Sequence, residues 1–204
     1  RILENTDRNG FLSMSDEDVD AKISLYFKEY LDESMGGDYG KDADFMLSAD
    51  NVKRTIKEIV MHLREEFSQS KFYPFAYEAS ISAGGDGFSP RVITSENGVD
   101  VCFIGNVDRA DVFNDDAEKF IRVVDYKTGD KAFSFKDVYY GKNMQMLIYL
   151  YSIAESIDKS IPAGVLYMPS HTAVSELDRN ATKEQIKSHL EKNYKMRGVV
   201  LDNE

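Results

Sequence analysis

The sequence is poor in the features that mark disulfide-bonded and membrane proteins. It has one cysteine, Cys102, among 204 residues, which excludes an internal disulfide and a four-cysteine metal site within the chain. Its longest hydrophobic runs, such as 144–150, are far too short to span a bilayer, and no signal-peptide pattern opens it. The GxSxG elbow of serine hydrolases is absent too. We therefore expect a soluble, cytoplasmic protein with no membrane partner.

Basic residues are also scarce. The 25 lysines and arginines are outnumbered by 36 acidic residues, which gives a net charge of −11. Because phosphate binding normally requires a basic surface, this balance argues at first against a nucleic-acid partner. Residues 1–50, however, hold 13 acidic and 5 basic side chains, whereas residues 51–204 hold 23 and 20. The acidity thus belongs mainly to a solubilising first quarter, and the later chain can form local basic patches.

What the sequence does contain predicts an α/β fold. Apolar residues three or four apart indicate helices, and short runs rich in β-branched and aromatic residues indicate strands. We expect a single domain over residues 1–204, with a mainly helical part at 1–72 and a core at 73–204. Helices are expected at about 16–30, 50–68, 141–157 and 182–194, and strands at 76–82, 91–95, 101–107, 120–126 and 163–168. Residues 1–4 are typical of the tail of a helix, so we expect the chain to be a fragment.

Two carboxylates stand at the ends of predicted strands. Asp108 follows one apolar run, and Asp125 lies 17 residues later in the next strand, two positions before Lys127. Alternation along a strand puts Asp125 and Lys127 on one face and Tyr126 on the other. If Asp108 lies beside Asp125, a hard divalent cation such as magnesium or manganese would relieve their repulsion. The pattern is compatible with metal-assisted hydrolysis; solvated residues at the end of an edge strand are the alternative.

The helix that follows favours the site interpretation. Gln145 and Tyr149 are four residues apart and therefore share a helix face. Most of this helix is apolar, and its other stripe can pack on a sheet. A polar pair directed at the strand ends has no evident structural purpose in such a helix.

Three motifs in this order resemble the nuclease domain of the RecB-like branch of the PD-(D/E)XK superfamily, and most closely the AddB family of bacterial helicase-nuclease subunits. The first is Gly-Asn-Val-Asp-Arg-Ala-Asp at 105–111, and the second is Val-Asp-Tyr-Lys-Thr-Gly at 124–129. The third is the Gln-x-x-x-Tyr motif at 145–149. The similarity covers roughly the last two-thirds of the chain and is faint in residues 1–72. It implies a restriction-endonuclease-like fold, a central mixed β-sheet flanked by helices.

The resemblance implies a metal site. Asp108 and Asp125 would hold magnesium or manganese, with the backbone carbonyl of Tyr126 as a further ligand. Lys127 would orient the attacking water or stabilise charge in the transition state. Glu78, in an earlier strand, resembles an accessory acid of the family.

The resemblance also implies DNA as the substrate, with single-stranded ends as the expected form. Gln145 and Tyr149 would position the DNA strand or the Lys127 ammonium, and we expect Arg109 and Lys142 to contact DNA. The family acts in double-strand break repair and recombination as part of a helicase-nuclease, so an AddA-type partner is implied.

Two family features are missing from the sequence. The family usually adds a histidine ligand on a helix ahead of these strands, and residues 1–4 resemble the segment just after it, so that histidine would lie outside this chain. AddB proteins commonly carry an iron–sulfur cluster, which Cys102 alone cannot form. Two alternatives stay open: a stand-alone exonuclease of the same superfamily, and a catalytically inactive DNA-binding or assembly module with the same fold.

Overall fold

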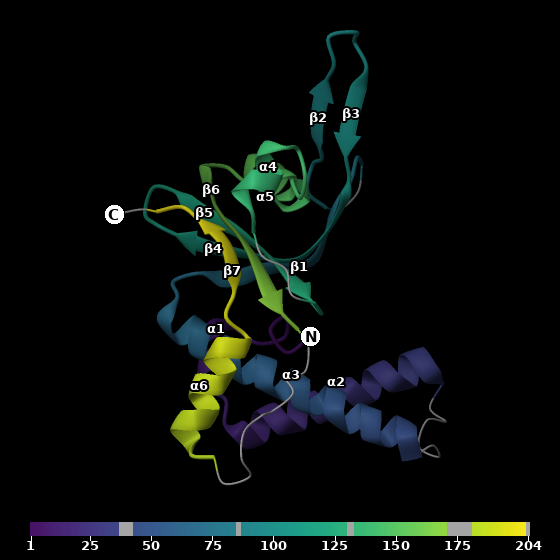
Figure 1. Cartoon of the computed structure of the whole chain (residues 1–204), viewed down its shortest axis with the longest axis vertical. Helices are drawn as coiled ribbons and strands as arrows, with labels where there is room; N and C mark the ends of the chain where they lie inside the picture. Colours follow the sequence, from purple (N-terminus) through teal and green to yellow (C-terminus); the bar gives the residue numbers. More distant parts are fainter. Residues whose placement is uncertain (37–42, 85–86, 130–132, 171–180, 203–204) are drawn as a thin grey trace. The chain divides into compact units, whose positions relative to one another are not determined.

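The computed structural model describes residues 1–202 except 37–42, 85–86, 130–132 and 171–180 (Figure 1). The chain divides into two compact units, one of residues 1–70 with 170–195 and one of residues 71–169 with 196–204. The expected boundary at residue 72 therefore lies close to the division between Ser70 and Lys71. The segment 170–195, which we expected in the core with the strands, belongs instead to the helical unit.

The helical unit contains four helices in the described part of the chain. They are α1 (Arg8–Ser13), α2 (Asp16–Met35), α3 (Ala43–Gln69) and α6 (Lys183–Asn193). α2 begins at Ser15, whose side chain forms a capping box with Asp18, and α6 begins with an equivalent box. Both starts agree with the sequence, but α3 begins seven residues before the expected position. None of the described helices is long and apolar enough to cross a membrane.

Two features lie near the start of the helical unit. Residues 1–5 form a turn closed by an Asn5 N–H to Arg1 carbonyl hydrogen bond of 3.1 Å. The short helix α1 was not predicted. It brings Phe11 against Phe67 of α3, with ring centroids 6.1 Å apart, and both side chains are fully buried.

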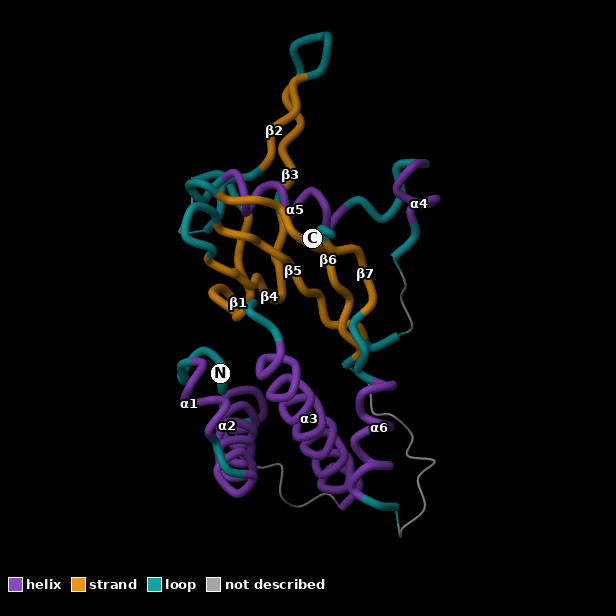
Figure 2. The backbone as a smooth tube through the Cα atoms, turned by 90° about the vertical axis from the view of Figure 1, so that its left-hand side faces the viewer, coloured by secondary structure: helices purple, strands orange, loops and turns teal. Residues whose placement is uncertain are grey.

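The second unit is built on a five-stranded mixed sheet, which confirms the predicted α/β class (Figure 2). Its strands, in spatial order, are β1 (Tyr73–Ile81), β4 (Gly105–Asn114), β5 (Lys119–Lys127), β6 (Ser160–Pro169) and β7 (Arg197–Val200). β5 and β6 are parallel, whereas the other neighbours are antiparallel. The central strand β5 has an almost continuous buried run from Phe120 to Val124, as strands covered on both faces do.

A separate two-stranded hairpin, β2 (Arg91–Thr94) and β3 (Asp100–Phe103), extends away from the large sheet (Figure 1). The single strand expected at 101–107 is therefore two strands, because the chain leaves the hairpin at Ile104 and enters the sheet as β4. Cys102 is exposed on this hairpin. The strand β7 and the short helix α4 (Phe135–Tyr139) were also not predicted, since each has only four or five residues.

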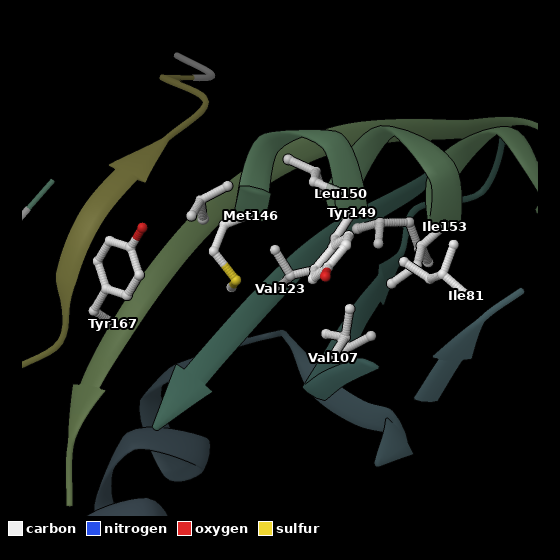
Figure 3. Close-up of a cluster of buried hydrophobic side chains, with 11 residues drawn as sticks. Ile81, Val107, Val123, Met146, Tyr149, Leu150, Ile153 and Tyr167 are labelled. Carbon is white, nitrogen blue, oxygen red and sulfur yellow. The ribbon is translucent and has the colours of Figure 1, made fainter. Parts of the chain in front are cut away.

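The parallel pair β5 and β6 requires a crossover, and this connection contains α5 (Gln145–Glu155). α5 places Met146, Leu150 and Ile153 against Val123 in a buried cluster of 11 residues (Figure 3). Burial of each large apolar side chain contributes roughly 1.5–3 kcal/mol. The cluster therefore fixes α5, which carries Gln145 and Tyr149, on the sheet that carries the two carboxylates.

Candidate active site

The two carboxylates lie on neighbouring central strands. β4 and β5 are antiparallel, with Arg109 opposite Val124, so Asp108 and Asp125 are the next residues along the two strands beyond this pair. The Oδ2 atom of Asp108 accepts a hydrogen bond of 2.7 Å from the backbone N–H of Tyr126. This bond ties Asp108 to the residue that immediately follows Asp125.

Lys127 is paired with Asp125. Its Nζ atom lies 2.5 Å from Asp125 Oδ2, which makes the two groups an ion pair. The side chains of Asp125 and Lys127 are 17% and 35% exposed, so both reach solvent at the end of β5. One ammonium group accompanies two carboxylates, which leaves an excess negative charge that a cation could balance.

Glu78 lies on the neighbouring strand β1 beside Asp108. The strand pairs on either side of it are Tyr77 with Arg109 and Ala79 with Val107. Glu78 is exposed and has a φ of 44°, in the left-handed region that is costly for a residue with a side chain. Such strain often occurs at functional positions.

These residues have oxygen donors suited to a hard cation, but they do not form a complete cage. Carboxylate oxygens of Asp108 and Asp125, with the Tyr126 carbonyl, match the chemistry that magnesium and manganese prefer. Among the described residues, however, no three acidic, histidine or cysteine side chains are grouped closely enough to hold a metal. The donor set therefore fits a cation that keeps several waters or phosphate oxygens as ligands.

Gln145 and Tyr149 are joined to each other. Gln145 Nε2 donates a hydrogen bond of 2.8 Å to the Tyr149 hydroxyl, which lies 3.5 Å from the Ile104 carbonyl. Tyr149 is buried in the core cluster (Figure 3), whereas Gln145 is exposed. A Cβ atom on Gly105 would lie 1.8 Å from the Tyr149 hydroxyl, so the glycine of the first motif makes room for the tyrosine of the third.

Arg109 does not reach the surface where DNA would bind. Its side chain is fully buried, with Nη2 3.0 Å from Asp111 Oδ2 and Nη1 2.8 Å from the Tyr126 hydroxyl. Arg122 Nε donates a second bond, of 2.8 Å, to the same Asp111 oxygen. The structure therefore argues against the expected DNA contact of Arg109, which belongs to a buried ion cluster of Arg109, Asp111 and Arg122. Lys142 is exposed in the turn between α4 and α5.

The buried ion cluster was missed from the sequence, although strand alternation would have indicated it. Arg109 and Asp111 alternate with Asp108 along β4, so they belong to the opposite face of the sheet. Tyr126 has the same relation to Asp125 and Lys127 on β5, which confirms that it points away from them. Burial raises the pKa of the Tyr126 hydroxyl and outweighs the opposing effect of Arg109, so this group stays neutral.

Comparisons with known proteins show which proteins the chain is similar to. The chain is 32% identical over 205 residues to the AddB-type ATP-dependent helicase/deoxyribonuclease subunit of Clostridium acetobutylicum, covering 98% of this chain and 17% of that protein. It is 33% identical over 185 residues to the protein of the same name from Ruminiclostridium cellulolyticum, with 88% and 16% covered. It is 36% identical over 159 residues to the protein of the same name from Clostridium kluyveri, which covers 76% of this chain and 14% of that protein. The chain thus spans less than a fifth of the length of these relatives.

The family comparison covers almost the entire chain. Residues 4–200 match the PD-(D/E)XK nuclease superfamily, so the relationship includes the helical unit, in which we saw only faint resemblance. The match contains all three motifs and the five strands of the large sheet. This chain belongs to the PD-(D/E)XK nuclease superfamily.

Proposed function

We propose that this chain is the divalent-metal-dependent nuclease domain of a helicase-nuclease, and that it hydrolyses phosphodiester bonds in DNA. The observation that carries the proposal is the position of Asp108 and Asp125 on adjacent strands with Lys127 paired to Asp125. The names of the relatives support DNA as the substrate and a helicase in the same polypeptide or complex. Membership of a nuclease superfamily supports the reaction type.

The site residues have different proposed roles, and one group of them would bind the metal. Asp108, Asp125 and the Tyr126 carbonyl would hold magnesium or manganese, and Glu78 is an accessory acid beside Asp108. The metal, when bound, supplies Lewis acidity at the scissile phosphate and lowers the pKa of the attacking water. The hydrogen bond from the Tyr126 N–H fixes the Asp108 carboxylate, so the ligand is oriented before the metal binds.

Lys127 and Gln145 are the groups that would face the DNA. Once a cation balances Asp125, the Lys127 ammonium can turn from the carboxylate to orient the water or to stabilise charge on the phosphoryl oxygens. Gln145 is exposed and can reach the strand, whereas Tyr149 is buried. Tyr149 is therefore a positioning residue that acts through its hydrogen bond to Gln145.

The biological setting follows from the same proposal. The full protein would process double-strand breaks for recombination together with an AddA-type partner, and single-stranded ends would be the form of DNA that reaches this domain. Phosphate contacts supplied elsewhere in such a complex would explain why a chain of net charge −11 can act on DNA. An iron–sulfur cluster would have to use cysteines beyond this chain, because Cys102 is its only one.

The test is digestion of linear single-stranded DNA by the full-length protein with magnesium, manganese or a chelator. We expect cleavage only with metal, and a loss of about a hundredfold or more in Asp108→Asn and Lys127→Ala. Matched controls are Asp116→Asn and Lys119→Ala, which change the same charges at the opposite end of the β4–β5 pair. Cleavage that survives both site substitutions would refute the assignment, as would cleavage in excess chelator. A protein that binds DNA but never cleaves it would indicate the inactive module.

A further inference from the structure

Residues 133–144, which lie between β5 and α5 in the sequence, expose three large aromatic side chains. Phe135, Tyr139 and Tyr140 are 71%, 84% and 66% exposed, and all lie in or next to α4. α4 buries none of its residues, and Figure 2 shows it standing clear of the five-stranded sheet. Single exposed apolar side chains are common, but a contiguous group of them marks an interaction surface.

This segment is held in a defined shape. Phe133 packs on the core cluster and contacts Phe135 edge to face, with ring centroids 5.0 Å apart. The Ser134 side chain caps α4, and the Lys142 N–H donates a bond of 2.7 Å to the Asp137 carbonyl. The turn also uses a positive φ at Asn143, whose side chain bonds the Asp137 carboxylate at 3.1 Å. The aromatic groups are therefore presented on an anchored backbone, which reduces the entropy lost on binding.

The rings of the two tyrosines are largely exposed to solvent. They contact each other edge to face, with centroids 5.3 Å apart and planes at 84°, so they do not stack on each other. A flat partner such as a nucleobase can lie on either ring, and stacking of this kind tolerates any base because every base has a π face.

The charge around the tyrosines suits a phosphate backbone. Lys136 and Lys142 are exposed on either side of them, whereas Asp137, the carboxylate within residues 133–144, is bonded to Asn143. The segment 133–144 thus carries a net positive charge in a strongly acidic chain. Exposed aromatic rings interspersed with lysines are the combination that binds single-stranded nucleic acid.

We propose that Tyr139 and Tyr140, flanked by Lys136 and Lys142, form a platform on which bases of single-stranded DNA stack as the strand approaches Asp108 and Asp125. In sequence, the segment follows β5, which carries Asp125 and Lys127, and leads directly into Gln145. The inference rests on the proposed nuclease function and adds the place where the DNA substrate is bound. Such a platform would favour single strands over duplexes, because the bases of a duplex are stacked on each other and unavailable to the rings.

The experiment measures binding without cleavage. In the full-length protein carrying Asp125→Asn, we would measure by fluorescence anisotropy the Kd for a single-stranded oligonucleotide of about 16 nucleotides. The double substitution Tyr139→Ala/Tyr140→Ala should weaken binding about tenfold to a hundredfold. Tyr139→Phe/Tyr140→Phe should restore it, because the rings suffice. Tyr151→Ala, which removes an exposed tyrosine from α5, should have no effect and is the matched control.

A second probe separates stacking from charge. For an abasic oligonucleotide of equal length, Tyr139→Ala/Tyr140→Ala should leave the Kd unchanged, whereas Lys136→Ala/Lys142→Ala should weaken binding of both probes. An unchanged Kd for the base-containing strand in the tyrosine variant would overturn the platform. Loss of a copurifying protein with an unchanged Kd would identify a protein-binding surface and would overturn it as well. Cleavage that persists with Asp125→Asn would instead refute the active-site assignment, independently of the stacking result.

Discussion

The same two strands carry two groups of charges that differ in almost every physical respect. The buried ion cluster has two arginines around Asp111, with each partner at hydrogen-bond distance and the Arg109 and Asp111 side chains fully buried. The carboxylate site, which is Asp108, Asp125 and Lys127, has more negative than positive charge and reaches solvent. The first group is buried and its members are bonded to one another, whereas the second is accessible to a ligand.

The difference shows how a functional site can be recognised next to a structural one. Buried charges that pair with one another are held by the protein itself and are not accessible to a ligand. Carboxylates that repel, with one ammonium group to offset them, cost stability until a cation arrives. β4 and β5 therefore place a buried group with one excess positive charge on one face of the sheet and a solvent-accessible group with one excess negative charge on the other, one residue apart in sequence.

The largest difference between the two groups should appear when the carboxylate of the buried ion cluster is removed. Asp111→Asn should lower the free energy of unfolding by about 3–5 kcal/mol, because both arginines lose the charge that they share in the interior. Urea unfolding of the chain, followed by circular dichroism, measures the loss. A change below about 1 kcal/mol would mean that the cluster does not hold these strands together.

The corresponding change at the carboxylate site should behave differently. Asp125→Asn removes charge repulsion from a solvent-accessible site, so the stability without metal should change by less than about 1 kcal/mol. Saturating magnesium or manganese at about 100 times its Kd should stabilise the wild type by roughly 2.7 kcal/mol and should not stabilise the variant. Thermal unfolding with and without metal tests both statements, and equal stabilisation of the two proteins would contradict the metal assignment.

The sequence predicts those features that depend on interactions between residues close together in the chain. Ser15 and Thr182 mark helix starts through short-range capping, and β5 is evident from its own apolar run. The pairing of Asp108 with β5 was inferred because strand alternation and family motifs agree. The role of Arg109 was not, because the Tyr126 hydroxyl that it bonds and the Arg122 side chain with which it shares Asp111 lie on β5 and reach it only through β4–β5 pairing. Similarly, β7 acquires its place only by pairing with β6.

Substitution of Gly105 tests whether Tyr149 contributes to core packing, to the position of Gln145, or to both. Gly105→Ala would place a methyl group 1.8 Å from the Tyr149 hydroxyl, so the ring must shift within a tightly packed core. We expect a loss of about 1–3 kcal/mol in the free energy of unfolding, together with reduced cleavage because Gln145 loses its partner. The second substitution Tyr149→Ala should make the Gly105→Ala change nearly neutral for stability, since the clash is gone. Additive effects in this double-mutant cycle would show that the two residues do not interact.

The smallest expected effect is at Tyr126, which connects the two groups. Its hydroxyl accepts a bond from Arg109, and its backbone N–H donates to Asp108. Tyr126→Phe should cost only about 0.5–1.5 kcal/mol at neutral pH and should leave cleavage intact, because the N–H remains.

The pH dependence of this loss provides a sharper readout. Burial raises the pKa of Tyr126 in the folded protein, whereas the unfolded chain ionises near its ordinary value of about 10. Above that pH, ionisation therefore favours the unfolded wild type but not unfolded Tyr126→Phe, so the stability advantage of the wild type should shrink as the pH rises. Urea unfolding of both proteins at about pH 8 and about pH 11 measures it. A constant difference would mean that the hydroxyl is not held neutral, and a loss of cleavage in Tyr126→Phe would show that the buried ion cluster and the carboxylate site are coupled through this ring.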